Sequence, residues 1–325
     1  MRAVRVHELT GPAALRVDTD VPEPTVAAGQ VLIEVKAAGV NFPDVLLSRG
    51  MYQFKPTPPF SPGGEASGIV SAIGPGVTSV AVGDRVAVTL LYGAFAERVV
   101  APELAVVKLP DAVGFEVGAA TLLTYATTLH ALTDRAMLQK GETLLVLGAA
   151  GGVGIAAVEL GALIGARVIA AASTDDKLAF CREHGASEVI NYGTEDLKDR
   201  VKALTSGNGV DVVYDPVGGS LAETALRGMA WQGRYLVVGF ASGDIPKIPL
   251  NLVLLKGCQI VGVFWGSFAM REPAKNRAHA DQIFRWVAEG KLRPAIDAVL
   301  PFDRAAEALG RLGARNVKGK LVLTP

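Results

Sequence analysis

The stretch "LLVLGAAGGVGIAAVELGALIGARVIAAAST", residues 144–174, constrains the fold more than any other part of the chain. It reads as an apolar strand, a glycine-rich turn, a helix of small residues and a second apolar strand. A membrane-spanning helix would also be apolar, but this stretch carries Glu159 and Arg167 and is interrupted by glycines. A strand–turn–helix–strand unit explains that pattern, because the N-terminus of such a helix presents free N–H groups to a phosphate. The stretch therefore predicts a dinucleotide-binding unit.

The turn itself, AAGGVG at residues 149–154, keeps the second and third glycines of the G-x-G-x-x-G fingerprint. Gly151 lets the backbone approach the pyrophosphate, and Gly154 allows the helix to pack closely on the strand. Ala149 stands where the first glycine belongs, so we expect that residue to avoid positive φ. The turn residues predicted to contact the nucleotide are Gly151, Gly152, Val153 and Gly154.

The second strand ends without the acid that would bind a ribose 2′-hydroxyl, because residues 172–174 read AST. A 2′-phosphate can therefore lie there without like-charge repulsion, hydrogen-bonded by Ser173 and paired with Lys177. The same segment also suits a helix start, with a serine or threonine N-cap and first-turn acids at Asp175 and Asp176. Both descriptions can hold at once, although the two aspartates place negative charge near the phosphate. The local charges favour NADP(H) over NAD(H).

Composition narrows the class of protein. A chain of 325 residues exceeds the usual size of one hydrophobic core, so we expect two domains. Basic and acidic residues balance to a net charge of zero with no basic stripe, which argues against a nucleic-acid partner. Cys181 and Cys258 are far apart, which argues against a disulfide framework and fits the cytoplasm. The N-terminal segment MRAVRVHELTGP lacks the apolar core of a signal peptide.

The pattern of apolar residues changes along the chain. Roughly the first 120 residues contain short valine- and isoleucine-rich runs between Gly/Pro turns, which predicts mainly β-structure with one helix at about 42–49. From about residue 124 helical and strand patterns alternate, which predicts a doubly wound α/β domain with right-handed crossovers. A helix and a final strand follow residue 266. We therefore divide the chain into 1–123, 124–265 and 266–325, with the last part returning to the first domain.

Several motifs in this order resemble the medium-chain dehydrogenase/reductase superfamily over essentially the full length. They are GVNFPDVLLSRGMY, PFSPGGEASGIVSAIGPGV, GDRV, the AAGGVG turn, VINY, VVYDPVGG and NVKGKLVL. Zinc alcohol dehydrogenases of that superfamily have a cysteine and a histidine where this chain has Asn41 and Gly64, and no cysteine precedes Cys181. A catalytic zinc needs three protein ligands, so we expect no metal. The pattern resembles the zinc-free quinone oxidoreductase branch.

This resemblance implies a GroES-like, mainly-β catalytic domain formed by both chain ends around a Rossmann NADP-binding domain, and usually a homodimer. It implies that Asn41 and Thr127 approach the nicotinamide end of NADPH. It also implies that Ser173, Lys177 and Tyr192 surround the adenosine 2′-phosphate, and that Phe240 and Asn316 line the cleft.

Without a metal, a developing oxyanion needs hydrogen-bond donors. Tyr52, in SRGMYQF, is the candidate, since related enoyl-thioester reductases carry a tyrosine at the matching place that is proposed as proton donor. Tyr52 could equally be a half-buried tyrosine that packs the turn. Asp44 could orient Asn41 or the cofactor ribose, or it could cap the helix that starts near residue 43.

Three functions remain open. The first is an NADPH-dependent reductase of quinones or other conjugated carbonyl compounds. The second is an enoyl-thioester or acrylyl-type reductase, in which Tyr52 protonates the α-carbon after hydride reaches the β-carbon. The third is a non-catalytic NADPH-binding protein, which would have no need for Tyr52, Asn41 and Thr127 at the nicotinamide end. No histidine forms a convincing triad with serine and aspartate, so hydrolysis is not supported.

Overall fold

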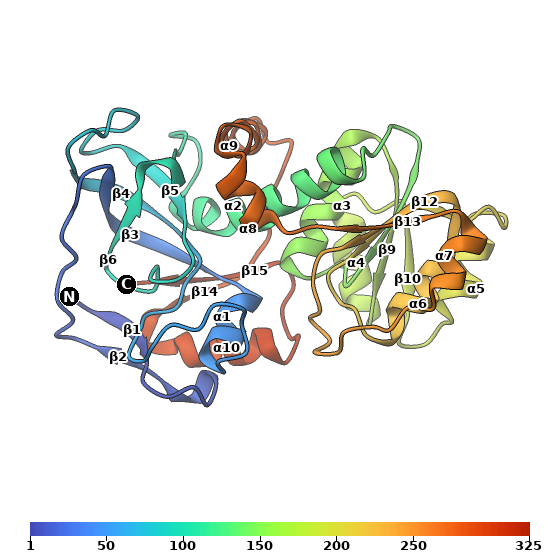
Figure 1. Cartoon of the computed structure of the whole chain (residues 1–325), viewed down its shortest axis with the longest axis horizontal. Coiled ribbons are helices and arrows are strands. Elements are labelled where there is room, and N and C mark those ends of the chain that lie inside the picture. Colours follow the sequence, from blue (N-terminus) through green and yellow to red (C-terminus); the bar gives the residue numbers. More distant parts are fainter. The chain divides into compact units, whose positions relative to one another are not determined.

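The computed structural model describes all 325 residues, which pack as two units. The first unit contains Met1–Leu123 and Pro273–Pro325, so it holds both termini, and the second contains Thr124–Glu272 (Figure 1). The sequence placed the return to the first unit at residue 266, seven residues before the structure does. The difference arises because helix α8, Trp265–Arg271, still packs in the second unit. Its Phe268 ring is buried and stacks on His130 with 3.9 Å between the ring centroids.

The first unit is built on a seven-stranded sheet in the order β14-β15-β3-β4-β5-β7, with β6 also paired to β3. Its longest strand is β3 (Gln30–Val40), in which Val31, Ile33 and Val35 alternate inward with more exposed neighbours, as one buried sheet face requires. The last strand, β15 (Lys320–Thr324), runs antiparallel to β3, so the end of the chain completes a sheet begun near its start. The remaining strands of this unit are β1 (Ala3–Val6), β2 (Leu15–Asp18), β4 (Glu65–Ile73), β5 (Arg85–Thr89), β6 (Arg98–Pro102), β7 (Val106–Lys108) and β14 (Ile296–Pro301).

Helices of the first unit are few. They are α1 (Phe42–Ser48), α9 (Pro273–Ala288), α10 (Ala305–Gly313) and the short 3₁₀ turns Pro12–Ala14, Glu103–Ala105 and Phe302–Arg304. Helix α2 (Phe115–Leu129) starts in this unit, nine residues before the helix that the sequence led us to expect at 124. Its first turns are small and apolar, and Ala119 and Ala120 pack against Ala37 of the sheet. That packing explains why the helix begins so early.

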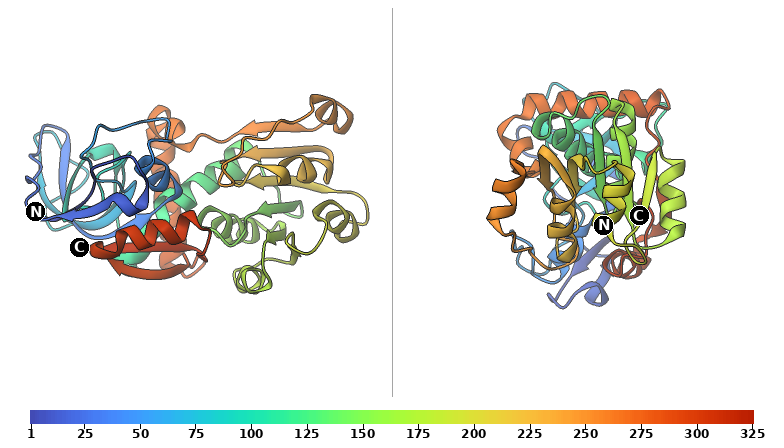
Figure 2. Two further views of the ribbon diagram at one scale, coloured as in Figure 1. Left: turned by 90° about the horizontal axis from the view of Figure 1, so that it is seen from below. Right: turned by 90° about the vertical axis from the view of Figure 1, so that its right-hand side faces the viewer.

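The second unit is a six-stranded parallel sheet in the order β10-β9-β8-β11-β12-β13, with helices on both faces (Figure 2). If the six strands are numbered along the chain from β8, their order in the sheet is 3-2-1-4-5-6, which is the order found in dinucleotide-binding sheets. The doubly wound α/β prediction is therefore confirmed. The strands are β8 (Thr143–Leu147), β9 (Arg167–Ala172), β10 (Glu188–Asn191), β11 (Val210–Asp215), β12 (Met229–Val237) and β13 (Gln259–Gly262). The helices are the π-helical turn His130–Arg135, α3 (Gly152–Ile164), α4 (Asp175–Glu183), α5 (Leu197–Leu204), α6 (Ser220–Arg227), α7 (Leu250–Lys256) and α8.

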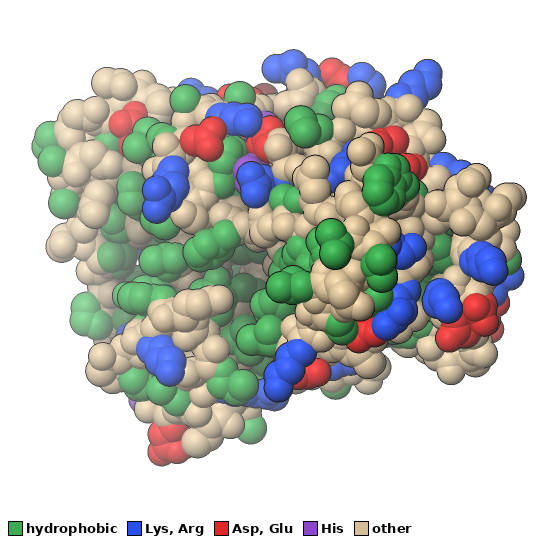
Figure 3. Space-filling view, turned by 45° about the vertical axis from the view of Figure 1, so that its right-hand side comes forward, with side chains coloured by type: hydrophobic (Ala, Val, Ile, Leu, Met, Phe, Trp, Pro, Cys, Tyr) green, Lys and Arg blue, Asp and Glu red, His purple; other side chains and the backbone are tan.

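The surface agrees with the balanced composition. On the face drawn in Figure 3, Lys and Arg side chains are dispersed among Asp and Glu side chains and apolar ones. None of the helices is long and apolar enough to span a bilayer.

The glycine turn after β8 differs in one detail from the fingerprint. Gly148, one residue before the expected position, takes the positive φ of 57°, whereas Ala149 is not among the residues with positive φ, as predicted. A Cβ atom at Gly154 would lie 2.3 Å from the carbonyl oxygen of Gly148, which is backbone and cannot swing aside. Gly154 is therefore required because the start of α3 lies against the turn that precedes it.

We predict that Gly154→Ala lowers the free energy of unfolding by about 1–3 kcal/mol, because the added methyl overpacks the turn. Gly310→Ala is the matched control, since a Cβ there meets nothing within 4 Å and alanine is favoured over glycine in helices by about 1 kcal/mol. Thermal unfolding followed by circular dichroism measures both variants. A Gly154→Ala midpoint equal to that of the wild type would show that the turn relaxes freely.

Candidate active site

The N-terminus of α3 lies at the carboxyl end of β8 and leaves its first N–H groups without helical partners. Gly151 is the N-cap, with φ −76° and ψ 170°. A Cβ at Gly151 would meet only the Gly148 carbonyl oxygen, at 3.4 Å, so the side of the turn to which a side chain would point is open. An open backbone surface beside free N–H groups is what a pyrophosphate requires. The turn therefore fits a dinucleotide.

Ser173 and Tyr192 follow the neighbouring parallel strands β9 and β10, so both lie at the carboxyl edge of the sheet. Ser173 is exposed and Tyr192 is half-buried. Thr174, and not Ser173, is the N-cap of α4, because its hydroxyl accepts a hydrogen bond from the backbone N–H of Lys177 at 3.4 Å. The hydroxyl of Thr174 therefore caps the helix, while the hydroxyl of Ser173 stays available for the predicted contact with the 2′-phosphate. The sequence allowed both roles at once.

Asp175 is one of the two aspartates that the sequence raised as an objection to a 2′-phosphate, and although the residue is exposed its carboxylate accepts a hydrogen bond from the protein. The Asn191 amide Nδ2 donates to Asp175 Oδ1 at 2.7 Å, and the Asn191 carbonyl Oδ1 accepts from the N–H of Gly193 at 3.0 Å. Asn191 lies at the end of β10 and is buried. The charge of Asp175 is therefore directed at a buried amide that is anchored to the neighbouring strand, which weakens that objection.

Two further predicted residues lie in or beside the second sheet. Phe240 is 37% exposed just beyond β12, and its ring lies against Gly218, where a Cβ would meet Phe240 Cδ1 at 2.9 Å. Thr127 is half-buried on α2. The next residue, Thr128, is buried and shares a 2.8 Å hydrogen bond with the hydroxyl of Tyr214 on β11, which fixes this part of α2 against the sheet. Contacts of Phe240 and Thr127 with a cofactor stay predictions.

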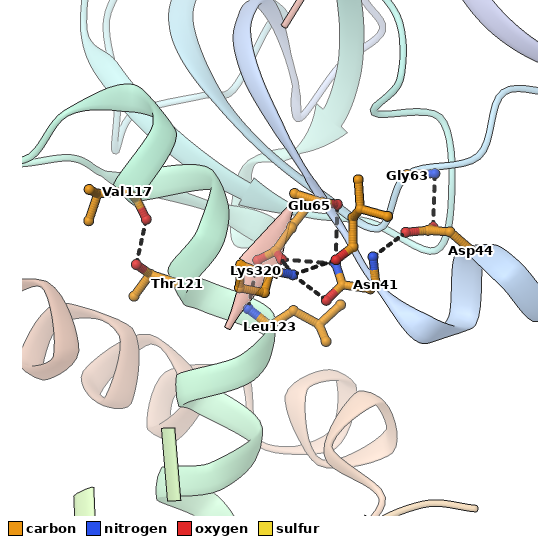
Figure 4. A network of polar contacts seen from close by, with 10 residues as sticks. Asn41, Asp44, Gly63, Glu65, Val117, Thr121, Leu123 and Lys320 are labelled. Carbon is orange, nitrogen blue, oxygen red and sulfur yellow. Dashed lines mark hydrogen bonds and ion pairs between the residues drawn. The ribbon is translucent and has the colours of Figure 1, made fainter. Parts of the chain in front are cut away.

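In the first unit, Asn41 and Asp44 lie at the start of α1. Both are buried, and Asp44 is only 1% exposed (Figure 4). Asp44 Oδ2 accepts from the N–H of Asn41 at 2.8 Å, and its Oδ1 accepts from the N–H of Gly63 at 3.0 Å. Asp44 thus caps α1 and holds the Gly63 turn, which is one of the two roles that the sequence left open; a contact with the cofactor ribose stays a prediction.

Burial raises the pKa of Asp44 to about 7, and the negative charge of Glu65 adds to the rise. The two backbone N–H bonds and the positive charge of Lys320 act in the opposite direction but are outweighed. Asp44 is therefore a carboxyl group that changes its protonation near neutral pH while it is fully enclosed by the protein.

The sequence analysis missed an ion pair between Lys320, the first residue of β15, and Glu65, the first residue of β4. Lys320 Nζ lies 2.6 Å from Glu65 Oε1, and the side chains are 4% and 1% exposed. Both residues lie inside motifs quoted above, NVKGKLVL and PGGEASG, but they are 255 positions apart. Nothing in their local spacing indicates that they meet. Figure 4 shows both side chains pointing at Asn41.

Tyr52 is half-buried and packs against the core of the first unit. Burial raises the pKa of its phenol, and the charge of Asp44 raises it further. The phenol is therefore protonated at neutral pH and can donate a hydrogen bond. Asn316, in the same unit, is exposed just after α10, and its contact with a cofactor stays a prediction.

No group of three or more His, Cys, Asp or Glu side chains is arranged to hold a metal ion. At Gly64, where zinc enzymes of the superfamily have a histidine, a Cβ would already lie 3.4 Å from Leu123 Cδ1 and 3.5 Å from the Leu90 carbonyl oxygen. These are ordinary van der Waals distances, so the absence of a side chain at Gly64 is a matter of sequence and not of space.

A parallel sheet in dinucleotide-binding order, together with a mainly-β unit formed by both chain ends, defines a medium-chain dehydrogenase/reductase. Sequence comparison agrees: the alcohol dehydrogenase GroES-like domain family matches residues 27–111, and the zinc-binding dehydrogenase family matches residues 152–280. The chain belongs to the quinone oxidoreductase branch of that superfamily.

Individual relatives support this assignment. The chain is 40% identical to a quinone oxidoreductase-like protein 2 homolog of Nematostella vectensis, over 99% of this chain and 88% of the relative. A mycobacterial protein solved in complex with NADPH superposes with a TM-score of 0.94 at 33% identity, over 100% of both chains. The quinone oxidoreductase of Escherichia coli, also solved with NADPH, superposes with a TM-score of 0.91 at 29% identity, again over 100% of both chains.

The raised pKa of Asp44 predicts how its contribution to stability depends on pH. The folded protein keeps the proton up to about pH 7, whereas the unfolded chain releases it near the ordinary value of 3.8. The stabilisation from Asp44 is therefore complete below that lower pKa and is lost as the pH rises through about 7.

In Asp44→Asn the new NH₂ group would face one of the two backbone donors. We expect a loss of about 1–3 kcal/mol near pH 5. The loss should be smaller near pH 8, because the wild type itself is less stable there. Urea unfolding at both pH values measures this, with Asp303→Asn as a control because that side chain is 65% exposed. A deficit that is the same at both pH values would contradict this, because an Asp44 ionised in the folded state would bind no proton in either state above pH 5.

Proposed function

We propose that this protein is an NADPH-dependent reductase that reduces quinones or other conjugated carbonyl compounds without a metal ion. The observation that carries the proposal is the carboxyl edge of the second sheet. There the open N-terminus of α3 and the acid-free end of β9 lie on adjacent parallel strands. The quinone oxidoreductase names of the relatives and the two NADPH complexes support the same conclusion.

Each predicted side chain has a separate task in this proposal. The N–H groups of residues 151–154 bind the pyrophosphate, and Ser173, Lys177 and Tyr192 bind the 2′-phosphate. Asn41 and Thr127 act toward the nicotinamide half, and Phe240 and Asn316 line the cleft. Asp44 holds the start of α1. Bound NADPH supplies a hydride.

Tyr52 supplies the hydrogen bond that the substrate oxygen needs as it gains negative charge. Its raised pKa keeps the phenol protonated, and its place at the core of the first unit limits its motion. For an enone or an enoyl thioester, the phenol proton passes to the enolate left after hydride reaches the β-carbon, and solvent then reprotonates the tyrosine. For a quinone, the two reduced oxygens can take protons from water.

Independence from zinc is supported by the residues themselves. Asn41 and Gly64 replace the cysteine and histidine of the zinc enzymes, and no alternative ligand cluster exists. Hydrogen-bond donors must then stabilise the developing charge that a Lewis acid would otherwise take.

We also propose a homodimer, supported by an exposed edge in the second unit. Strand β13 pairs only with β12, and its Ile260 is 41% exposed. Nearby Trp231 is 70% exposed over Gly257, and Leu254 and Leu255 of α7 are 79% and 72% exposed. An unpaired apolar strand edge is the surface on which a second copy can extend the sheet.

We expect the protein to act in the cytoplasm on a small molecule. Cys181 and Cys258 are both free and buried, and burial raises the pKa of the Cys181 thiol to about 12, so that thiol is unreactive. Free, unpaired cysteines fit a reducing compartment.

The proposed function is tested by NADPH consumption with purified, chelator-treated protein against three acceptors in parallel: a quinone, an enone and an enoyl-CoA ester. We expect turnover of the quinone or the enone without added metal. Turnover of the enoyl-CoA ester alone would move the assignment to the thioester reductases. No turnover with any acceptor, despite tight NADPH binding, would favour a non-catalytic NADPH-binding protein.

We predict that NADPH binds at least about ten-fold more tightly than NADH, a difference of about 1.4 kcal/mol. Isothermal titration calorimetry measures both affinities. Lys177→Met should reduce the preference, whereas Lys198→Met, an exposed lysine on α5 of the same unit, should not. Equal affinities in the wild type would contradict the proposal, and the aspartates at the start of α4 would then be the cause to examine.

We predict that Tyr52→Phe lowers kcat for an enone or an enoyl thioester by about 10²-fold, the lower end of the effect of a general acid. For a quinone the loss should be only a few-fold, because water can protonate the product oxygens. NADPH affinity and thermal stability should be unchanged. Tyr92→Phe, at an exposed tyrosine of the same unit, is the control. A large loss of stability in Tyr52→Phe would show instead that Tyr52 packs the turn.

A further inference from the structure

Lys320 is a buried lysine whose hydrogen-bonding capacity is used up inside the first unit. Its Nζ donates to the Val40 carbonyl oxygen at 2.9 Å, to Asn41 Oδ1 at 2.5 Å and to Glu65 Oε1 at 2.6 Å. An ammonium group has three N–H donors, so none is left for a substrate. Lys320 therefore does not act directly as an acid or as an anion-binding group.

The two amide hydrogens of Asn41 are used as well. Its Nδ2 donates to Glu65 Oε1 at 2.9 Å and to the carbonyl oxygen of Gly39 at 3.2 Å. The orientation of the amide is fixed by its neighbours, because Lys320 can only donate and the Glu65 carboxylate only accepts. The capping box at the start of α1 brings the Asn41 side chain toward the backbone N–H of Asp44, but that N–H donates to the backbone carbonyl oxygen of Asn41 at 3.0 Å. The second lone pair of Asn41 Oδ1 is therefore the one position of the amide that these hydrogen bonds do not use. It can accept a hydrogen bond but cannot donate one.

Glu65 connects Lys320 and Asn41 to helix α2. Its Oε1 accepts from both Lys320 and Asn41, while its Oε2 accepts from the backbone N–H of Leu123 on α2 at 3.0 Å. The orientation of one amide therefore depends on α2 and on the first residues of β4 and β15 (Figure 4).

Stability alone does not account for this arrangement. Removing two charges from water is costly, and well-packed apolar residues of similar volume often stabilise a protein as well or better. The sheet around the pair is otherwise apolar, with Val40, Ala66 and Leu321 all buried. An apolar pair could not fix the orientation of the Asn41 amide. Lys320 donates to its oxygen and Glu65 accepts from its nitrogen.

We propose that Lys320 and Glu65 are positioning residues for Asn41, and that they present it to the nicotinamide half of NADPH as a hydrogen-bond acceptor only. This inference rests on the proposed function. An acceptor suits a ribose hydroxyl or the NH₂ of the nicotinamide carboxamide. It cannot stabilise an oxyanion on the substrate, so that task is left to the phenol of Tyr52.

The test uses variants that separate stability from orientation. Lys320→Met alone leaves Glu65 buried without its partner and should lower the melting temperature. Adding Glu65→Leu removes the second charge and should restore most of that loss. The orientation of Asn41 is not restored, so the double variant should still bind NADPH at least about five-fold more weakly and lose kcat, by up to about 10²-fold for a misplaced group. KM for the acceptor should change little. Lys108→Met, which breaks an exposed lysine pair with Asp84 in the same unit, is the control and should match the wild type.

A cycle with Asn41→Ala shows whether the pair acts through that amide. In the Asn41→Ala background, the double substitution should have little further effect on NADPH affinity, because the group it positions is gone. Additive losses would overturn the proposal, as would a double variant with wild-type stability, affinity and kcat.

Glu65→Gln keeps the test decisive if the double variant does not fold. Its carbonyl oxygen can still accept from Lys320 and Asn41, while its NH₂ faces the N–H of Leu123. NADPH affinity should then stay within about two-fold of the wild type although stability falls, whereas a merely structural pair would lower both together. If the wild type binds NADPH but reduces no acceptor, the proposed function is refuted. The role of Lys320 and Glu65 in positioning Asn41 is then still tested by the NADPH affinities of the variants. A wild type that does not bind NADPH would refute both.

Discussion

The start of α1 depends on one buried interaction, the ion pair between Lys320 and Glu65, since both side chains are hydrogen-bonded to Asn41. Burying two charges is tolerated only when their geometry and their remaining hydrogen bonds are satisfied, and here Asn41, Val40 and the backbone of Leu123 complete the set. The pair joins the last strand of the chain to the sheet that its first third builds. The start of α1, where Asn41 and Asp44 lie, is therefore complete only when β15 has paired with β3.

A second constraint, steric rather than electrostatic, shapes the nucleotide-binding unit. The carbonyl oxygen of Gly148 leaves no room for a side chain at Gly154, so α3 must begin tightly against the turn. The same turn leaves the side of Gly151 open. Close packing on one side and free backbone on the other are two consequences of one local geometry, which is the geometry that an anion-binding helix start requires. The hydrogen bond from Asn191 to Asp175 keeps a nearby carboxylate engaged within the protein.

The features that the sequence predicted well were local ones. The alternation of helices and strands in the second unit, the positive φ avoided by Ala149 and a hydroxyl cap at the start of α4 all follow from residues close together in the chain. The features that it missed depend on contacts across the chain. Lys320 and Glu65 meet over 255 positions, α2 begins at Phe115 because its alanines pack on a distant strand, and α8 stays with the second unit through Phe268 and His130. Periodicity and motif spacing carry no information about such partners.

The central claim is metal-independent hydride transfer from NADPH to a conjugated carbonyl compound. The most direct measurement uses NADPH carrying deuterium at the transferred position of nicotinamide C4, an enone acceptor and protein stripped of metals with a chelator. The account predicts that the deuterium appears on the β-carbon of the product, at a rate that added zinc does not change. Deuterium that stays in the cofactor, or that reaches the product only after zinc is restored, would contradict it.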